Sequence, residues 1–501
     1  MANTVDSPPT AFTEATSSEE TSREALRPWS PQTGSIPDST EGTLWSAVRE
    51  SLRGTHRDYT EGPIGRAIIV LAIPMVLEML MESVFAVVDI FWVAHLGADA
   101  VATVGLTESM LTLIYALAVG LGIGATAMVA RRIGEHNPEG AARAAVQAIA
   151  LGLIVSILVS VSGYLLAPRL LRAMGGSRWV VEQGVGFTRV MFLGNATILL
   201  LFLINAIFRG AGDAAIAMRV LWLANAINIV LGPFFIFGIG PFPELGVMGA
   251  AVATTIGRGI GVIYAFFRLV RSGGRFDIRR RHLKLEVPIM LRLVRLSATG
   301  TFQVFIGMAS WIGLIRTISS FGSDAVAGYT IGIRVIIFAL LPSFGMGNAA
   351  ATMVGQSLGA GKSNRAERAV WIAGFYNMLF LGSVGLVFVL FARQIISLFI
   401  DDPNVIPYGT DCLRIVALGF IFYAYGMVLT QSFNGAGDTW TPTIINLFVF
   451  WLWELPLAYA LAIVFEIGPR GVFIAITVAF STLAIASAAV FRRGRWKSKV
   501  V

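Results

Sequence analysis

The chain has 501 residues, of which 55% are hydrophobic and only 14% charged, and its mean hydropathy is +0.73. Soluble domains carry about 25% charged residues, so this composition excludes a soluble globular protein and predicts an all-α polytopic membrane protein. The net charge of +8 does not indicate nucleic-acid binding, because most basic residues lie in loops between apolar stretches, where the positive-inside rule accounts for them.

The first 62 residues carry no membrane span. Residues 1–42 are rich in Ser, Thr, Glu and Pro and predict a disordered tail, and no apolar segment near Met1 resembles a cleavable signal peptide. In residues 43–62, Leu44, Val48 and Leu52 recur every four positions, which predicts an amphipathic helix in the membrane interface. A frayed amphipathic linker is the alternative interpretation of this segment.

The first apolar stretch, residues 68–93, carries the acids Glu78, Glu82 and Asp89. At 100° per residue all three lie on one face of a helix, and Pro74, one turn earlier, predicts a bend. A carboxylate at membrane depth costs about 2.5–3.5 kcal/mol and normally faces a bundle interior or a wet cavity. This face is therefore predicted to bind a cation or relay protons. Polar contacts between packed helices are the alternative.

Twelve apolar stretches follow one another and predict twelve transmembrane helices, with residues 271–286 as a basic cytoplasmic linker between two groups of six. The predicted six-helix bundles are residues 63–270 and 287–492, and a basic cytoplasmic tail covers 493–501. Loops on one side hold roughly 24 Lys and Arg against roughly five on the other, which places both termini in the cytoplasm of a cell with this protein in its inner membrane. The expected spans are 68–93, 100–129, 144–167, 182–207, 216–240, 246–270, 287–320, 325–354, 369–392, 410–433, 441–465 and 471–491.

An internal repeat relates the two groups of helices. The sequence FRGAGD at Phe208–Asp213 recurs as FNGAGD at Phe433–Asp438, 225 residues later, and LGADAVA at Leu96–Ala102 matches FGSDAVA at Phe321–Ala327 at the same spacing. Six helices per copy give both copies the same orientation. We therefore expect two six-helix bundles related by a pseudo-twofold axis along the membrane normal, with a central cavity between them.

Polar residues gather in the first copy of the repeat. Asn228 lies in the fifth span and Thr254 in the sixth, and neutral oxygens of this kind complete the shell of a hard cation that a carboxylate begins. The second copy lacks this set, because Asp89 maps onto Leu314 and Thr254 onto Ala479. The asymmetry predicts an ion site in the N-terminal half. Ordinary drift between the two copies is the alternative.

Aromatic and methionine side chains are frequent within the spans, and they suit a cavity for flat, apolar or cationic molecules. Lipid contact and core packing are equally consistent with these residue types. The candidate substrate-cavity residues are Met75, Met79, Tyr115, Met308, Trp311 and Phe338.

Five motifs resemble those of the multidrug and toxic compound extrusion (MATE) family, in its prokaryotic form: VDIFWVAHLG, GLGIGATAMVARRIGE, FRGAGD, NIVLGPFF and MGAAVATTIG. The resemblance runs from about Ile64 to Arg493. It implies two bundles that alternate between inward-open and outward-open forms, and antiport of drugs or organic cations against Na⁺ or H⁺.

The resemblance also implies an ion site made of an Asp in the first helix, an Asn and an Asp in the fifth, and a Thr in the sixth. By motif these positions are Asp89, Asn228, Gly232 and Thr254, so the second acid of the family pattern is replaced by glycine. This departure favours H⁺ over Na⁺ as the coupling ion, because a Na⁺ site needs several oxygens. Glu78 or Glu82 is the candidate to supply the missing charge.

We therefore expect a secondary antiporter that exports small cationic or amphipathic compounds, with H⁺ or Na⁺, the drug-like substrate and the lipid bilayer as its partners. We expect a monomer, no cofactor, no catalytic centre and no metal beyond Na⁺. The segment GAGKS at Gly359–Ser363 is not a Walker loop, because Gln356 stands where that motif needs its first glycine. A lipid-linked saccharide flippase of the same superfamily and an ion channel are the alternatives.

Overall fold

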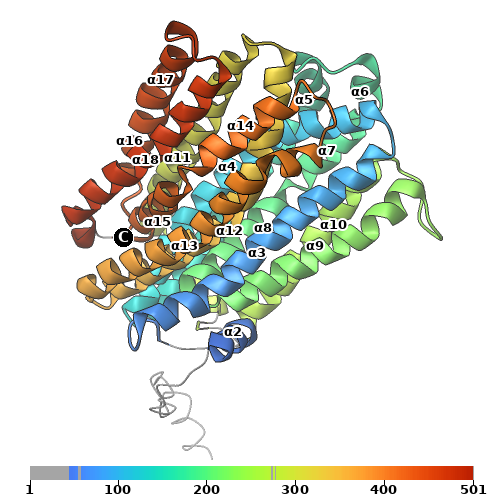
Figure 1. Ribbon diagram of the computed structural model, residues 1–501. Helices are drawn as coiled ribbons and strands as arrows, with labels where there is room; N and C mark the ends of the chain where they lie inside the picture. The colour runs from blue at the N-terminus through green and yellow to red at the C-terminus, as the bar shows by residue number, and fades with distance from the viewer. Residues whose placement is uncertain (1–43, 55–57, 272–274, 277, 500) are drawn as a thin grey trace, which may run out of the picture. The chain divides into compact units, whose positions relative to one another are not determined.

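A computed structural model describes residues 44–54, 58–271, 275–276, 278–499 and 501, and every regular element in them is helical (Figure 1). The predicted tail, residues 1–42, lies outside the described residues. The short helix α2 (Leu44–Arg53) forms where the amphipathic segment was predicted. Arg219 donates hydrogen bonds to the carbonyl oxygens of Leu52 and Arg53, at 2.6 and 2.8 Å, and so attaches the end of α2 to the bundle. Its position in a membrane interface stays a prediction.

The N-terminal half holds eight helices among the described residues. They are α3 (Ile64–Ala94), α4 (Ala98–Gly134), α5 (Pro138–Ala173), α6 (Arg178–Glu182), α7 (Val185–Leu193), α8 (Asn195–Ala211), α9 (Ala214–Phe237) and α10 (Val247–Val270). The helix α3 is a single element that continues through Pro74. A short 3-10 helix, η1 (Arg280–Leu283), lies in the linker.

The C-terminal half repeats this order. Its elements are α11 (Val287–Ser319), α12 (Ser323–Gly359), α13 (Ser363–Ser397), α14 (Ile406–Ala417), α15 (Phe420–Gly435), α16 (Trp440–Asn446), η2 (Leu447–Glu454), α17 (Leu455–Tyr459), η3 (Ala460–Val464), α18 (Pro469–Arg492) and η4 (Arg495–Ser498). The eleventh span changes to π-helical turns in η2 and η3, which places extra residues in the turns around Glu454.

The prediction of twelve spans is confirmed, with one correction. Ten helices are long and apolar enough to cross a membrane, and two bent pairs, α7 with α8 and α14 with α15, supply the other two. The sequence predicted each pair as one continuous span, but the pairs bend by 41° and 60°. Each break contains a glycine, Gly194 or Gly419, on which a Cβ would come within 2.5 Å of Thr255 or 3.2 Å of Thr477. The bends therefore follow the close approach of a neighbouring helix.

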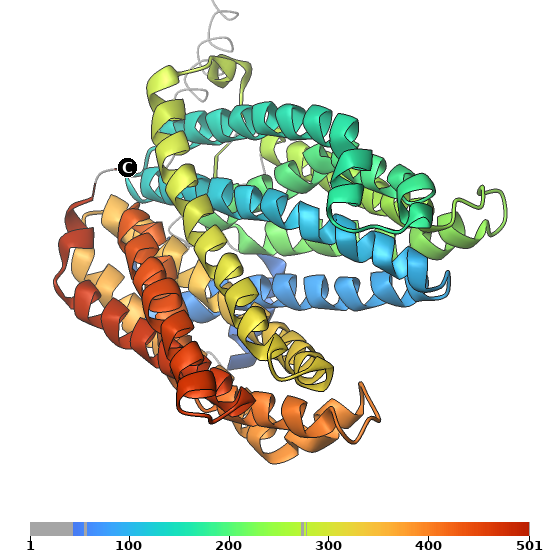
Figure 2. The ribbon, with the colours of Figure 1, turned by 90° about the horizontal axis from the view of Figure 1, so that it is seen from above.

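Pairs of glycines 225 residues apart mark the pseudo-twofold relation. A Cβ on Gly134 would lie 2.0 Å from the carbonyl oxygen of Gln356, and one on Gly359 would lie 2.3 Å from that of Arg131. Equivalent positions of the two halves thus contact each other reciprocally, as residues next to a twofold axis do. In the same way α3 packs against α12, and α11 packs against α4 (Figure 2).

The ends of the helices that carry the basic loops hold the two halves together. Arg131 donates to the carbonyl oxygen of Lys499 at 2.7 Å, and Gln356 donates to that of Gly210 at 3.0 Å. The N-terminal part of α3 joins the hydrophobic core of the C-terminal half through Leu71, whereas Val93 at its other end joins the core of the N-terminal half. The helix α3 therefore belongs to both halves.

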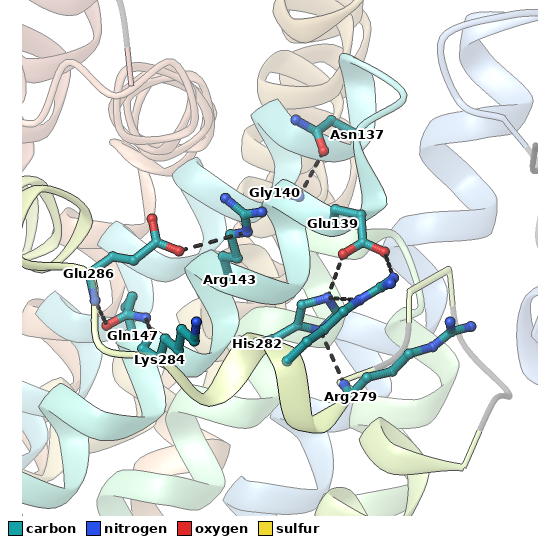
Figure 3. Close-up of polar contacts among 10 residues, drawn as sticks. Asn137, Glu139, Gly140, Arg143, Gln147, Arg279, His282, Lys284 and Glu286 are labelled. Atoms are coloured by element: carbon teal, nitrogen blue, oxygen red, sulfur yellow. Dashed lines mark hydrogen bonds and ion pairs between the residues drawn. The ribbon is translucent and has the colours of Figure 1, made fainter.

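The linker is fixed to the start of α5 by polar contacts (Figure 3). Glu139 accepts hydrogen bonds from Arg281 and His282. One turn or two further on, Gln147 donates to the carbonyl oxygen of Lys284 at 2.8 Å and accepts from the backbone N–H of Glu286 at 3.1 Å. A fully buried amide side chain thus satisfies two backbone groups of the linker immediately before α11 begins.

Candidate functional site

Glu78 is held inside the protein by two residues of α8. Its carboxylate lies 2.6 Å from the guanidinium of Arg209 and accepts a hydrogen bond of 3.2 Å from Asn205. Only 2% of the Glu78 side chain is exposed. Arg209 belongs to the repeated FRGAGD segment, so this motif supplies the counter-charge for the first acid of α3. The sequence-based suggestion that Glu78 replaces the missing ion ligand is not supported by this arrangement.

Glu82 faces a second buried arginine. Its carboxylate accepts a hydrogen bond of 3.0 Å from Asn225 of α9 and lies 3.7 Å from the guanidinium of Arg258 of α10. Arg258 is 3% exposed and donates a hydrogen bond of 3.3 Å to the hydroxyl of Tyr115. Its guanidinium also lies 5.6 Å from the centre of the Phe85 ring. Glu82 is therefore the centre of a cluster contributed by four helices.

Sequence reasoning did not identify Arg258. The signal was present, because a single arginine in the middle of a 24-residue apolar helix is costly and needs a partner. Its spacing is informative too: Arg258 lies one helical turn after Thr254, so both side chains project from the same side of α10.

Asp89 is the acid of α3 for which the described part of the chain shows neither a hydrogen bond nor an ion pair, and it is partly buried. The two neutral residues predicted to accompany it are brought together, since Asn228 donates a hydrogen bond of 2.8 Å to the hydroxyl of Thr254. Gly232 lies beside α3 as well: a Cβ there would be 3.8 Å from Trp92, one turn beyond Asp89. The position of the missing acid is therefore next to α3, without a side chain to act as ligand.

The candidate substrate-cavity residues divide by exposure. Met308 and Phe338 are 38% and 36% exposed, and Met79, Tyr115 and Trp311 are partly buried. These five have surface with which to contact a substrate. Met75 is the exception and is corrected here: its side chain is fully buried in the hydrophobic core of the C-terminal half, where α12 approaches α3 at Gly345. It packs the two halves together and lines no cavity in this structure.

The arrangement can hold one exchangeable cation equivalent. Glu78 and Glu82 are neutralised by two arginines, and Asp89 remains as a carboxylate beside a neutral amide and hydroxyl pair. A single carboxylate suffices for a proton, whereas an alkali cation needs more oxygen ligands than this pair and one acid provide.

Comparison with known proteins gives consistent results. The MatE family model matches residues 74–234 and 300–460, one match in each half. The chain is 26% identical over 462 residues to the probable multidrug resistance protein NorM of Thermotoga maritima, covering 91% of this chain and 98% of that protein. It is 24% identical over 429 residues to the FAD transporter of Shewanella oneidensis, covering 85% and 93% of the two. A solved structure of a MOP superfamily transporter from Pyrococcus furiosus aligns with a TM-score of 0.83 and 27% identity, covering 89% of this chain and 100% of that one.

Proposed function

The chain belongs to the MatE family of membrane transporters, whose model matches both halves, and from this premise we propose that it is an inner-membrane antiporter that exchanges protons for small organic compounds. The observation that carries the proposal is the state of the three acids of α3. Two of them are bound to arginines at 2.6 and 3.7 Å, and Asp89 alone is left to bind and release an ion.

The proposed direction is export of cationic or amphipathic compounds. The aromatic side chains of Tyr115, Trp311 and Phe338 suit flat cations, and Tyr115 and Trp311 are partly buried while Phe338 is 36% exposed. Similarity alone does not fix the substrate, because the relatives of this chain include both a probable multidrug resistance protein and an FAD transporter.

The proposed orientation places both termini in the cytoplasm. The basic loops and the described C-terminal residues lie at the end where the halves contact each other, as the bond from Arg131 to Lys499 illustrates. If this end is cytoplasmic, the structure represents a form closed to the cytoplasm, and transport requires these contacts to open.

The test uses the full chain in proteoliposomes loaded with a fluorescent organic cation. A pH gradient alone should drive transport, a Na⁺ gradient at clamped pH should not, and Asp89→Asn should abolish the response while the protein remains folded by size-exclusion chromatography. Transport by Na⁺ alone would disprove the proposed ion. Gradient-independent leakage would indicate a channel, and movement of a lipid-linked saccharide instead of the cation would indicate a flippase.

A further inference from the structure

The feature with the least obvious purpose in this transporter is Arg258. A guanidinium stays charged at every physiological pH, and burying it in a membrane-spanning bundle is costly. A residue with only a packing role would avoid this cost. Arg258 is nevertheless 3% exposed, and its side chain reaches from α10 to Glu82 of α3 and Tyr115 of α4.

The contacts of Arg258 are incomplete. Its separation of 3.7 Å from the Glu82 carboxylate allows electrostatic attraction but exceeds a normal hydrogen-bond distance. The carboxylate of Glu82 is held instead by Asn225 at 3.0 Å. By contrast, Arg209 lies 2.6 Å from Glu78 and is fully engaged. Of the two buried arginines, Arg258 is therefore the one with donors left for a second partner.

The second partner available is Asp89. Arg258 lies within electrostatic range of Asp89, as does Glu108 of α4. The other charged or titratable groups around the cluster are Glu82 on α3, Tyr115 on α4 and, acting on Glu108 from the C-terminal half, Arg334 of α12. The facing residues of α9 and α10 are the neutral Asn225, Asn228 and Thr254.

We propose that Arg258 determines the ion selectivity of this site: its guanidinium is a resident cation that excludes Na⁺ from Asp89 and neutralises the Asp89 carboxylate after its proton has left. The proposal rests on the proposed proton coupling at Asp89. In the step concerned, the O–H bond of the Asp89 carboxyl breaks, the proton passes to water, and the electron pair remains on the carboxylate beside Arg258, whose own charge is unchanged.

Two consequences follow from simple electrostatics. A Na⁺ ion at Asp89 would be repelled by the fixed positive charge, whereas a proton bonded to the carboxyl oxygen leaves a neutral group that the guanidinium tolerates. Removing the positive charge should favour protonated Asp89 and permit a Na⁺ ion. Removing the competing Glu82 carboxylate should have the opposite effect on protonation, because Arg258 then has Asp89 as its main acidic partner.

The experiment compares the full-length wild type with Arg258→Gln, Arg258→Lys and Glu82→Gln in proteoliposomes. We expect the pH of half-maximal transport to rise in Arg258→Gln and to fall in Glu82→Gln, each by about one unit, or tenfold in proton affinity. Arg258→Lys, which keeps the charge, should remain close to the wild type. A purely structural role would change rates in all three variants without these opposite shifts.

A binding measurement independent of transport completes the test. In detergent, NaCl should raise the melting temperature of Arg258→Gln relative to choline chloride at equal ionic strength, because a bound ion stabilises the folded state. It should have no such effect on the wild type, on Arg258→Lys or on Arg258→Gln combined with Asp89→Asn. A proton-driven wild type together with an Arg258→Gln variant unaltered in both assays would overturn this inference alone, whereas a Na⁺-driven wild type overturns the proposed function. If Arg258→Gln does not fold, an unshifted Glu82→Gln profile is sufficient to overturn the inference.

Discussion

Arg209 and Glu78 form a salt bridge of 2.6 Å between α8 and α3, with only 12% and 2% of their side chains exposed. Removing one member of a buried pair leaves the other charge uncompensated, which typically costs about 3–5 kcal/mol. We expect Glu78→Gln to lower the melting temperature in detergent strongly and to reduce the yield of folded protein.

The double variant Glu78→Gln/Arg209→Gln provides the control, since it removes both charges and should recover part of the lost stability. Asp89→Asn, at an acid without a partner in the described residues, should change the melting temperature little. Equal destabilisation by Glu78→Gln and Asp89→Asn would show that Glu78 is not the structural member of the acidic face.

The contact of Gly134 with Gly359 predicts that neither position accepts a side chain. A Cβ on Gly134 would lie 2.0 Å from a backbone oxygen, so the two halves would have to separate locally, at a cost of about 1–3 kcal/mol. We expect Gly134→Ala and Gly359→Ala each to reduce thermal stability and transport. The matched control is Gly307→Ala, because a Cβ there meets no atom within 4 Å. If Gly307→Ala were as damaging as Gly134→Ala, steric contact would not be the cause.

Much of the fold could be predicted from the sequence, because the repeat is written in residues that pack against each other. The GAGD segments and the glycines near the ends of α4 and α12 are local signals that survive in both copies. The bends at Gly194 and Gly419 could not be predicted in the same way. They depend on Thr255 and Thr477, which approach from other helices and leave no periodic trace beside the glycines.

The candidate site was predicted only in part, and for a physical reason. Helical periodicity correctly places Glu78, Glu82 and Asp89 on one helix, but it carries no information about which acid is paired. That information lies in Arg209 and Arg258, which are distant in sequence and meet α3 only after the bundle has folded. The pairing, and not the face, distinguishes structural acids from the one proposed to exchange a proton.

The proposed topology can be checked by labelling, because Cys412 is the single cysteine of the chain and is buried. In a Cys412→Ala background we expect an impermeant maleimide to label Asp99→Cys and Asp324→Cys in whole cells, but not Glu139→Cys or Asn364→Cys. All four positions are exposed, so burial does not explain a negative result. Permeabilised cells should label at every site. Labelling at 139 but not at 99 in intact cells would reverse the orientation.

The hydrogen bond from Asn228 to Thr254 separates proton coupling from Na⁺ coupling. Thr254→Val removes the acceptor and leaves a buried amide donor unpaired, which costs about 1–3 kcal/mol of stability. The acid that exchanges the proton, Asp89, is untouched, so we expect pH-driven transport to fall by less than about tenfold, the factor that 1.4 kcal/mol represents.

A Na⁺ site responds differently to the same change, because Thr254 would be one of its few oxygen ligands and its loss would abolish coupling. Thr254→Ser keeps the hydroxyl and should match the wild type under either mechanism, which makes it the control for packing. The measurement is the initial rate of efflux from proteoliposomes under a pH gradient, with and without Na⁺. Complete loss of coupled transport in Thr254→Val, with Thr254→Ser active, would argue that the hydroxyl is an ion ligand and that Asp89 does not act alone.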